Sequence, residues 1–124
     1  MKPSQPRESL LIMTSTPSAD LSLSLHGEQS EVAIITLRRA QKRNALSDGL
    51  ILAIRDTFQN LPEEARAAVI DGEGEHFCAG LDLSELKERD AGEGVHHSRG
   101  WHIALDAVQY GRVPVIAALH GAVV

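Results

Sequence analysis

The sequence has little of several features that define large classes of proteins. Cys78 is its only cysteine, which excludes an internal disulfide framework and is typical of a reducing compartment. Aromatic residues make up 3% of the 124 residues, so a core must rest on Leu, Ile, Val and Ala. No apolar run approaches the roughly 20 residues that span a bilayer. The net charge of −5 argues against non-specific nucleic-acid binding, which needs a basic surface. We therefore expect a cytoplasmic globular protein with no nucleic-acid or membrane partner.

The chain divides into a tail and one domain. Residues 1–19 are rich in Pro, Ser and Thr without periodicity, which predicts a disordered tail before a domain over residues 20–124. Apolar and polar residues alternate over 21–25, as in a half-buried strand. Residues 32–37 are largely β-branched, as in a buried strand, and turn-forming residues separate the two runs. An opening β-hairpin is predicted.

A strand–helix–strand order follows the hairpin. Apolar residues recur every four positions and predict a helix over about 47–60, capped by Ser47 or Asn44. The run over 65–70 predicts a strand, and a helical connection between strands implies parallel pairing. A second helix is expected over about 93–110 and a further strand over 114–121. The order indicates an α/β fold. The apolar faces of the two helices are formed by Leu46, Leu50, Ile54 and Phe58, and by Trp101, Ala104, Leu105 and Val108.

The stretch EHFCAGLDLS, residues 75–84, joins a strand-like run to helix-like sequence. Asp82 followed by Glu85 three residues later is a capping-box pattern, which predicts a helix beginning near Asp82. Leu81 and Leu86 occupy the positions of a hydrophobic staple. Backbone N–H groups near a helix start lack partners, and Gly80 would let a ligand approach the backbone. The Leu81 N–H could thus receive an oxyanion, although an ordinary turn would use the same residues.

Three segments of the chain carry a family resemblance. VAIITLRRAQKRNAL, EHFCAGLDLSEL and a helix ending in QYGRVPVIAALHG follow one another at appropriate spacing. Together they resemble the crotonase family, also called the enoyl-CoA hydratase/isomerase superfamily, over residues 21–124. The resemblance implies a spiral of repeated strand–strand–helix units that is cut near its middle. One departure is Ala40, where the family usually has proline.

The resemblance also implies a site and a reaction. Family members process acyl-CoA thioesters, as in fatty acid metabolism, and stabilise an enolate in an oxyanion hole made of two N–H donors. No cofactor is implied, because coenzyme A belongs to the substrate. The resemblance makes the Leu81 N–H the first donor and assigns substrate contacts to Ala79, Gly80, Leu81, Asp82, Leu83, Lys42, Arg43 and Ala45.

In the family, the second donor and the acid–base glutamates lie at positions beyond the one that corresponds to Val124. The chain is therefore expected to be an incomplete fragment with little activity alone, and its parent a homotrimer or hexamer. Hydration of a 2-enoyl-CoA is the default reaction. The alternative is a non-catalytic CoA-binding module or an inactive gene remnant.

Other patterns in the sequence favour no chemistry of their own. Asp71-Gly72-Glu73-Gly74 lacks the third glycine and the immediate helix of a dinucleotide fingerprint. Cys78 is expected to pack the turn rather than act as a nucleophile with His76. Adjacent His96 and His97 have no metal-ligand spacing, so no metal is expected.

His102 needs a separate interpretation. A dehalogenase branch of the family has a histidine at a similar spacing before the Pro114 segment. The preferred interpretation is a partly buried structural histidine beside Trp101.

Overall fold

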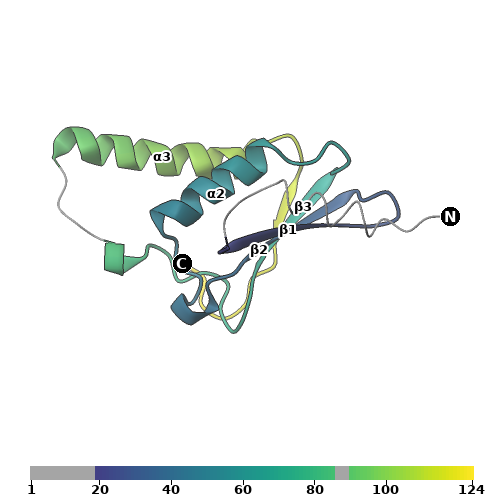
Figure 1. Ribbon diagram of the computed structural model, residues 1–124, viewed down its shortest axis with the longest axis horizontal. Helices are drawn as coiled ribbons and strands as arrows, with labels where there is room; N and C mark the ends of the chain where they lie inside the picture. The colour runs from purple at the N-terminus through teal and green to yellow at the C-terminus, as the bar shows by residue number, and fades with distance from the viewer. Residues whose placement is uncertain (1–18, 86–89) are drawn as a thin grey trace.

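The structure is a computed structural model that describes residues 19–85 and 90–124. The predicted tail thus lies outside the described residues except for Ala19. Four strands form one mixed sheet in the order β1-β2-β3-β4, and helices α2 and α3 lie together on one side of it (Figure 1). This arrangement confirms the predicted α/β class. The strands are β1 (Leu21–His26), β2 (Val32–Leu37), β3 (Ala67–Gly72) and β4 (Val115–Ala117).

The predicted hairpin is present. β1 and β2 pair antiparallel, with Leu21 opposite Leu37 and His26 opposite Val32. Burial alternates along both strands, as expected when a sheet turns one face to a core. The buried face carries Leu21, Leu23, Leu25, Ala33, Ile35 and Leu37.

Helix α2 (Asp48–Gln59) agrees with the predicted helix to within one residue at each end. Ser47 is its N-cap, because the Ser47 hydroxyl accepts a hydrogen bond from the Leu50 N–H at 3.1 Å. The buried face of α2 packs against the hairpin through Leu50, Ile51, Ile54 and Phe58. The chain then returns as β3, which pairs parallel to β2, as the strand–helix–strand order predicted.

Helix α3 (Ala91–Gln109) starts two residues before its predicted position. The Asp90 side chain caps it by accepting from the Glu93 N–H at 2.8 Å. Of the predicted apolar face, Ala104 is buried and Trp101 and Val108 are half-buried, but Leu105 is 49% exposed. Within residues 19–85 and 90–124, no helix combines the length and apolar character needed to cross a lipid bilayer.

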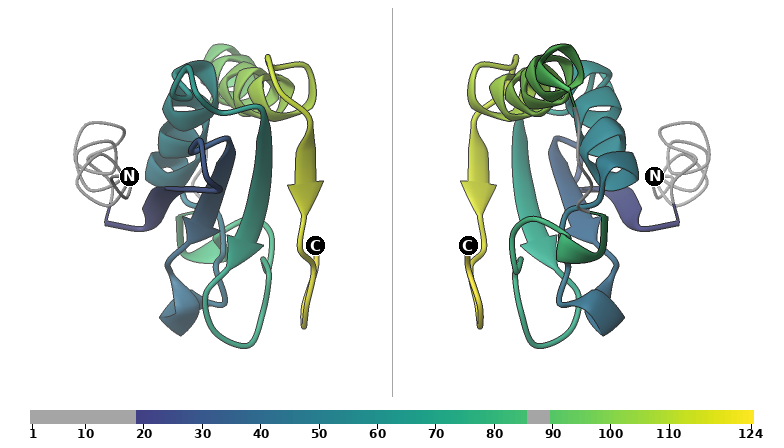
Figure 2. Two further views of the ribbon diagram at one scale, coloured as in Figure 1. Left: turned by 90° about the vertical axis from the view of Figure 1, so that its right-hand side faces the viewer. Right: turned by 90° about the vertical axis from the view of Figure 1, so that its left-hand side faces the viewer.

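β4 is shorter than predicted and forms one edge of the sheet. It pairs parallel to β3 over three residues, and its other side pairs with no strand among the described residues (Figure 2). Ile116, Leu119 and Val124 near this edge are 64%, 58% and 87% exposed. The strand then continues as an extended segment, residues 118–124, that runs beside the predicted functional turn.

Candidate functional site

The turn around Gly80 lies between two other segments of the chain. On one side, the Leu46 N–H donates to the Gly80 carbonyl at 2.7 Å, and the Asp82 N–H donates to the Leu46 carbonyl at 3.0 Å. On the other side, Cys78 exchanges hydrogen bonds with Ala122 and Val124 at 3.1 and 3.0 Å. The turn is thus held from both sides by segments 34 to 46 residues away in sequence.

The Leu81 N–H has no acceptor among the described residues. Leu81 forms a parallel bridge with Leu46, in which the neighbouring groups of residues 80 and 82 make the hydrogen bonds. Successive backbone groups along an extended segment point to opposite sides, so the Leu81 N–H points away from Leu46. The residue is 42% exposed. The structure therefore presents an available donor where the sequence predicted one.

Gly80 bends the chain at this point, as expected. Its φ of +89° lies in the region that side chains other than glycine rarely adopt. A Cβ placed on Gly80 would also lie 3.0 Å from Cγ1 of Val124. Glycine is thus required both by the backbone conformation and by the close approach of the C-terminal segment.

A helical turn begins near Asp82, as predicted, and the Asp82 carboxylate accepts from the Ser84 N–H in it. The turn is the 3₁₀ turn η2 (Leu83–Glu85) rather than an α-helix, and the next α-helix among the described residues begins at Ala91. Glu85 does not complete a capping box, because its carboxylate accepts instead from the Asp48 N–H at 3.0 Å, at the start of α2. The predicted staple partner, Leu86, lies outside the described residues.

Asp82 is buried, at 5% exposure, and all of its carboxylate contacts are internal. One oxygen accepts from the Ser84 N–H at 3.0 Å and from the Ser84 hydroxyl at 2.6 Å, and the other accepts from Arg39 at 3.0 Å. The Ser84 hydroxyl and the Arg39 guanidinium lower the pKa of Asp82 from 3.8 to about 2. Any substrate contact of Asp82 would have to come from its backbone.

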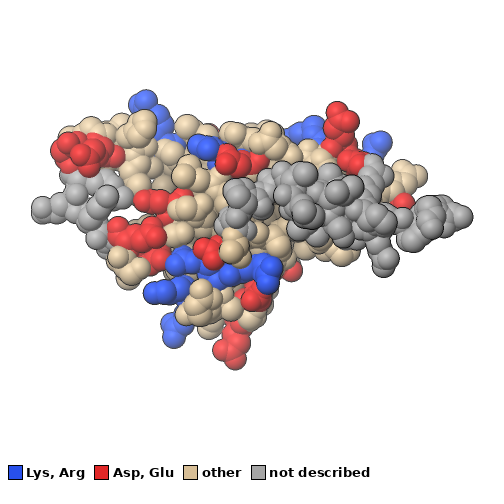
Figure 3. All heavy atoms as spheres, in the orientation of Figure 1, with Lys and Arg blue, Asp and Glu red and all other residues tan. Residues whose placement is uncertain are grey.

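The other predicted substrate residues divide into exposed and covered ones. Lys42 and Arg43 are exposed on the loop that contains the 3₁₀ turn η1 (Ala40–Lys42), where Figure 3 shows Lys and Arg side chains gathered at the lower left. Ala45 is buried at 8%, and its carbonyl accepts from Arg39. Ala79 is half-buried and donates to the Arg43 carbonyl at 3.0 Å, whereas Leu83 is 71% exposed. The chain thus brings the basic loop and the turn together through direct backbone contacts.

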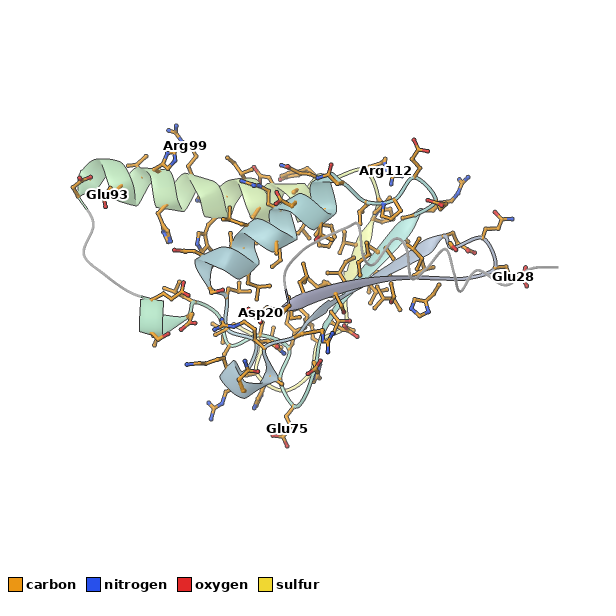
Figure 4. The ribbon with its side chains drawn as sticks, viewed as in Figure 1. Asp20, Glu28, Glu75, Glu93, Arg99 and Arg112 are labelled. Carbon is orange, nitrogen blue, oxygen red and sulfur yellow. The ribbon has the colours of Figure 1, made fainter. Side chains whose placement is uncertain are left out.

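Sequence reasoning missed two residues that connect these loops. Asn44 is fully buried with a φ of +56°, and its side-chain amide donates to the carbonyls of Glu73 and His76 at 2.9 and 2.8 Å. Arg39 has an 11% exposed side chain and contacts Ala45, Asp82 and Asp20, the last of which is labelled in Figure 4 at the start of β1. Asn44 had been considered only as a helix cap. Arg39 could not be distinguished by sequence from its exposed neighbour Arg38.

The structure gives Cys78 a packing role. The residue is 4% exposed, and its sulfur accepts from the Gly80 N–H at 3.4 Å. His76 Nδ1 accepts from the Ala122 N–H at 2.9 Å, so this imidazole is used to hold the C-terminal segment. Both observations agree with a structural turn. In the part of the chain that the structure describes, no three His, Cys, Asp or Glu side chains gather as metal ligands would.

Three further histidines, His96, His97 and His102, lie on α3. His97 Nε2 is 2.7 Å from an Asp48 carboxylate oxygen, and its ring lies beside Trp101 with the centroids 6.2 Å apart. These two residues help to line a cavity of about 460 Å³ between α2 and α3, whose lining does not include the Gly80 turn. His102 is exposed, which contradicts the expectation of a partly buried histidine. It faces outward because α3 contacts the rest of the described chain on its other side.

The comparisons with known proteins identify the same family throughout. The family model for enoyl-CoA hydratase/isomerase matches residues 27–124. A structure of a candidate enoyl-CoA hydratase from Rhodopseudomonas palustris shares 52% identity at a TM-score of 0.79, over 87% of this chain and 41% of that one. A candidate enoyl-CoA hydratase from Thermobifida fusca, solved in complex with acetoacetyl-CoA, shares 28% identity at a TM-score of 0.69, over 83% of this chain and 44% of that one.

A curated relative agrees with the solved structures. The enoyl-CoA hydratase ACTT3 of Alternaria alternata is 33% identical over 96 residues, which are 75% of this chain and 32% of that enzyme. The chain thus spans about a third of this relative and less than half of the two solved structures. The chain belongs to the enoyl-CoA hydratase/isomerase family, also known as the crotonase family.

Proposed function

We propose that this chain supplies the first half of an acyl-CoA site, in which the Leu81 N–H donates a hydrogen bond to the thioester oxygen. The observation that carries the proposal is the Leu81 N–H, which has no acceptor among the described residues and is directed away from Leu46. Three hydrogen-bonded segments fix the backbone around it. A donor held in this way needs no reorganisation when charge develops on the oxygen.

The chemistry of the site follows from that charge. Removing a proton next to a thioester carbonyl, or adding a nucleophile to its conjugated double bond, produces an enolate whose negative charge rests on oxygen. A fixed N–H lowers the energy of the enolate more than that of the neutral thioester, and this difference accelerates the reaction. Losing one donor of a comparable oxyanion hole costs about 10²–10³ in rate.

The position of Val124 supports a two-donor hole. Val124 lies against Gly80, and its N–H donates to the Cys78 carbonyl. In a longer protein, residues following Val124 would continue from a position next to Gly80. We propose that the second donor comes from such residues, and that hydration of a 2-enoyl-CoA is the default reaction of the whole enzyme.

The exposed basic loop supports recognition of the CoA part. Lys42 and Arg43 lie on the segment whose backbone bonds to Ala79, so their charges stand close to the turn. A CoA ligand carries several phosphate charges, which such cations attract. The bound acetoacetyl-CoA of the Thermobifida fusca relative agrees with this class of ligand. We propose that CoA enters over the loop that contains η1 and directs its thioester toward Gly80.

One observation favours a second candidate, a CoA-binding module without catalysis. The carboxylates nearest to Leu81 in sequence are engaged: Asp82 with Arg39 and Ser84, and Glu85 with the N-terminus of α2. Neither is placed to act as the acid or base of a hydratase. We therefore propose that the 124-residue chain alone binds acyl-CoA with little or no hydratase activity, and that its parent assembles as a homotrimer or hexamer.

An NMR titration tests the proposal. The ¹⁵N-labelled chain is titrated with acetoacetyl-CoA and, separately, with free CoA. We expect the amide resonances of the basic loop to shift with both ligands and the Leu81 amide to move downfield only with acetoacetyl-CoA. The proposal fails if the Leu81 resonance is unchanged at millimolar acetoacetyl-CoA.

A matched pair of variants isolates the role of charge. Arg43→Ala removes one exposed cation from the basic loop, and Arg66→Ala removes one exposed cation next to the far end of β3. We expect Arg43→Ala to weaken CoA binding several-fold at low salt, an effect that added salt reduces. Arg66→Ala should leave the affinity unchanged, and an equal loss in both variants would contradict the assigned entry route.

A further inference from the structure

Arg39 makes more contacts with the site than any sequence pattern indicated. Its guanidinium bridges two segments of the chain. One nitrogen donates to the Ala45 carbonyl, and another donates to the Asp82 carboxylate at 3.0 Å. The third nitrogen lies 3.6 Å from a carboxylate oxygen of Asp20. The Arg39 and Asp82 side chains are 11% and 6% exposed, so water screens their pairing little.

The bonds of this pair lie directly beside the Leu81 N–H. Asp82 follows Leu81 in the chain, and Ala45 precedes Leu46, the bridge partner of Leu81. The planar fork of arginine can hold a carboxylate and a carbonyl at fixed relative positions, which a lysine ammonium cannot do. The guanidinium therefore fixes the distance between the two segments whose backbone bonds orient residue 81.

We infer that Arg39 is a positioning residue for the proposed acyl-CoA site: through Asp82 and Ala45 it holds the Leu81 N–H in the orientation needed to meet a thioester oxygen. The inference rests on the proposed function for its catalytic meaning. Arg39 does not itself meet the substrate, since its side chain is covered. Its effect on an acyl ligand is transmitted through the backbone of residues 80–82.

Two conservative substitutions test the inference without emptying the space. Arg39→Lys keeps the charge but loses the fork, and Asp82→Asn keeps the shape but loses the charge of the acceptor. The neighbouring exposed pair, Arg38 and Glu73 at 3.0 Å, provides matched controls as Arg38→Lys and Glu73→Gln. All four variants are compared with the parent chain by ¹⁵N relaxation and by titration with acetoacetyl-CoA and CoA.

The first readout needs no ligand. We expect Arg39→Lys and Asp82→Asn to lower the heteronuclear NOE of the Gly80 and Leu81 amides and to shift their resonances, while core amides in β2 stay unchanged. The controls should leave both readouts at their parental values. Unchanged Gly80 and Leu81 amides in the two test variants would overturn the inference, whatever the chain binds.

The second readout connects the Arg39–Asp82 pair to discrimination between the two ligands. If the parent chain binds acetoacetyl-CoA more tightly than CoA, both test variants should reduce that affinity ratio about tenfold. A factor of this size corresponds to the free energy of about one hydrogen bond to a charged group. A general loss of folding would weaken both ligands equally and would count against a positioning role. If the parent binds neither ligand, the proposed function fails, and the relaxation readout alone decides whether Arg39 orders the turn.

Discussion

The side-chain amide of Asn44 lies 2.8 Å from the carbonyl oxygen of His76 and donates a hydrogen bond to it. The same nitrogen donates to the Glu73 carbonyl, and the amide oxygen accepts from the Arg39 N–H. A single buried side chain thus joins the basic loop to the loop that precedes the Gly80 turn. The two predicted halves of the ligand site depend on this connection for their relative position.

Asn44→Asp should therefore destabilise the chain. The substitution removes the buried donor to the Glu73 and His76 carbonyls, so we expect a loss of about 1–3 kcal/mol in total. Asn60→Asp is the matched control, because Asn60 is exposed and its amide donates to the Asp56 carbonyl within one helix end. Urea unfolding followed by circular dichroism measures both free energies of unfolding, and equal losses would contradict the connecting role of Asn44.

Substituting two glycines by alanine should give effects of opposite sign. Gly80→Ala places a side chain at a φ of +89° and against Val124, so we expect a loss of at least ~1 kcal/mol in the free energy of unfolding. Gly94 lies inside α3 with open space around it, so Gly94→Ala should stabilise by about 0.5–1 kcal/mol. Thermal melts report both changes, and a stabilised Gly80→Ala variant would contradict the described turn.

The lowered pKa of Asp82 predicts a pH dependence of stability. The folded value of about 2 lies below the ordinary value of 3.8, so the ionised carboxylate favours the folded state. This contribution is fully present above about pH 5 and is lost as the pH falls through 4 toward 2. Unfolding free energies of the parent and Asp82→Asn should differ at pH 7 and converge near pH 2. A constant difference over that range would refute the assignment, and Glu73→Gln serves as the exposed control.

Cys78 should react slowly with thiol reagents in the folded chain. The residue is 4% exposed, so labelling by a disulfide reagent requires opening of the turn, and the rate should rise sharply in urea. Cys78→Ala should cost about 1 kcal/mol of stability through lost packing, a typical value for one substitution. Stopped-flow absorbance follows the labelling. Rapid reaction under native conditions would show that the turn is open or that the thiol is activated.

Local sequence patterns predicted the regular elements well. Apolar residues every four positions located α2, because this helix buries one continuous face against the hairpin. The alternation in β1 likewise matches a sheet with one covered face. Such periodic patterns reflect burial, because one face of each helix or strand is buried along the whole length of that element. Because burial is local to each element, the boundaries of β1, β2, β3 and α2 were accurate to one or two residues, whereas β4 ends four residues earlier than predicted.

The same reasoning was wrong where side chains are used over long distances. The pattern at Asp82 predicted a capping box with Glu85, but the Glu85 carboxylate accepts from α2 instead, and Asp82 also pairs with Arg39, which is 43 residues away. Asn44 and Arg39 were missed for the same reason, since nothing near them in sequence marks their partners. The Leu81 N–H, which has no acceptor among the described residues, could be proposed as a donor from sequence because its position follows from the turn and from the family resemblance; its contact with a ligand stays a prediction.

The open edge of β4 predicts that the purified chain associates with itself. An edge strand with unpaired backbone groups and bare Ile116 and Val124 nearby is a template that accepts a neighbouring strand from any source. At high concentration, the edge strand of one molecule pairs with that of another, which leads to reversible association and eventually to precipitation. At low concentration, a synthetic β-strand peptide added in trans would occupy the same edge and compete with this association.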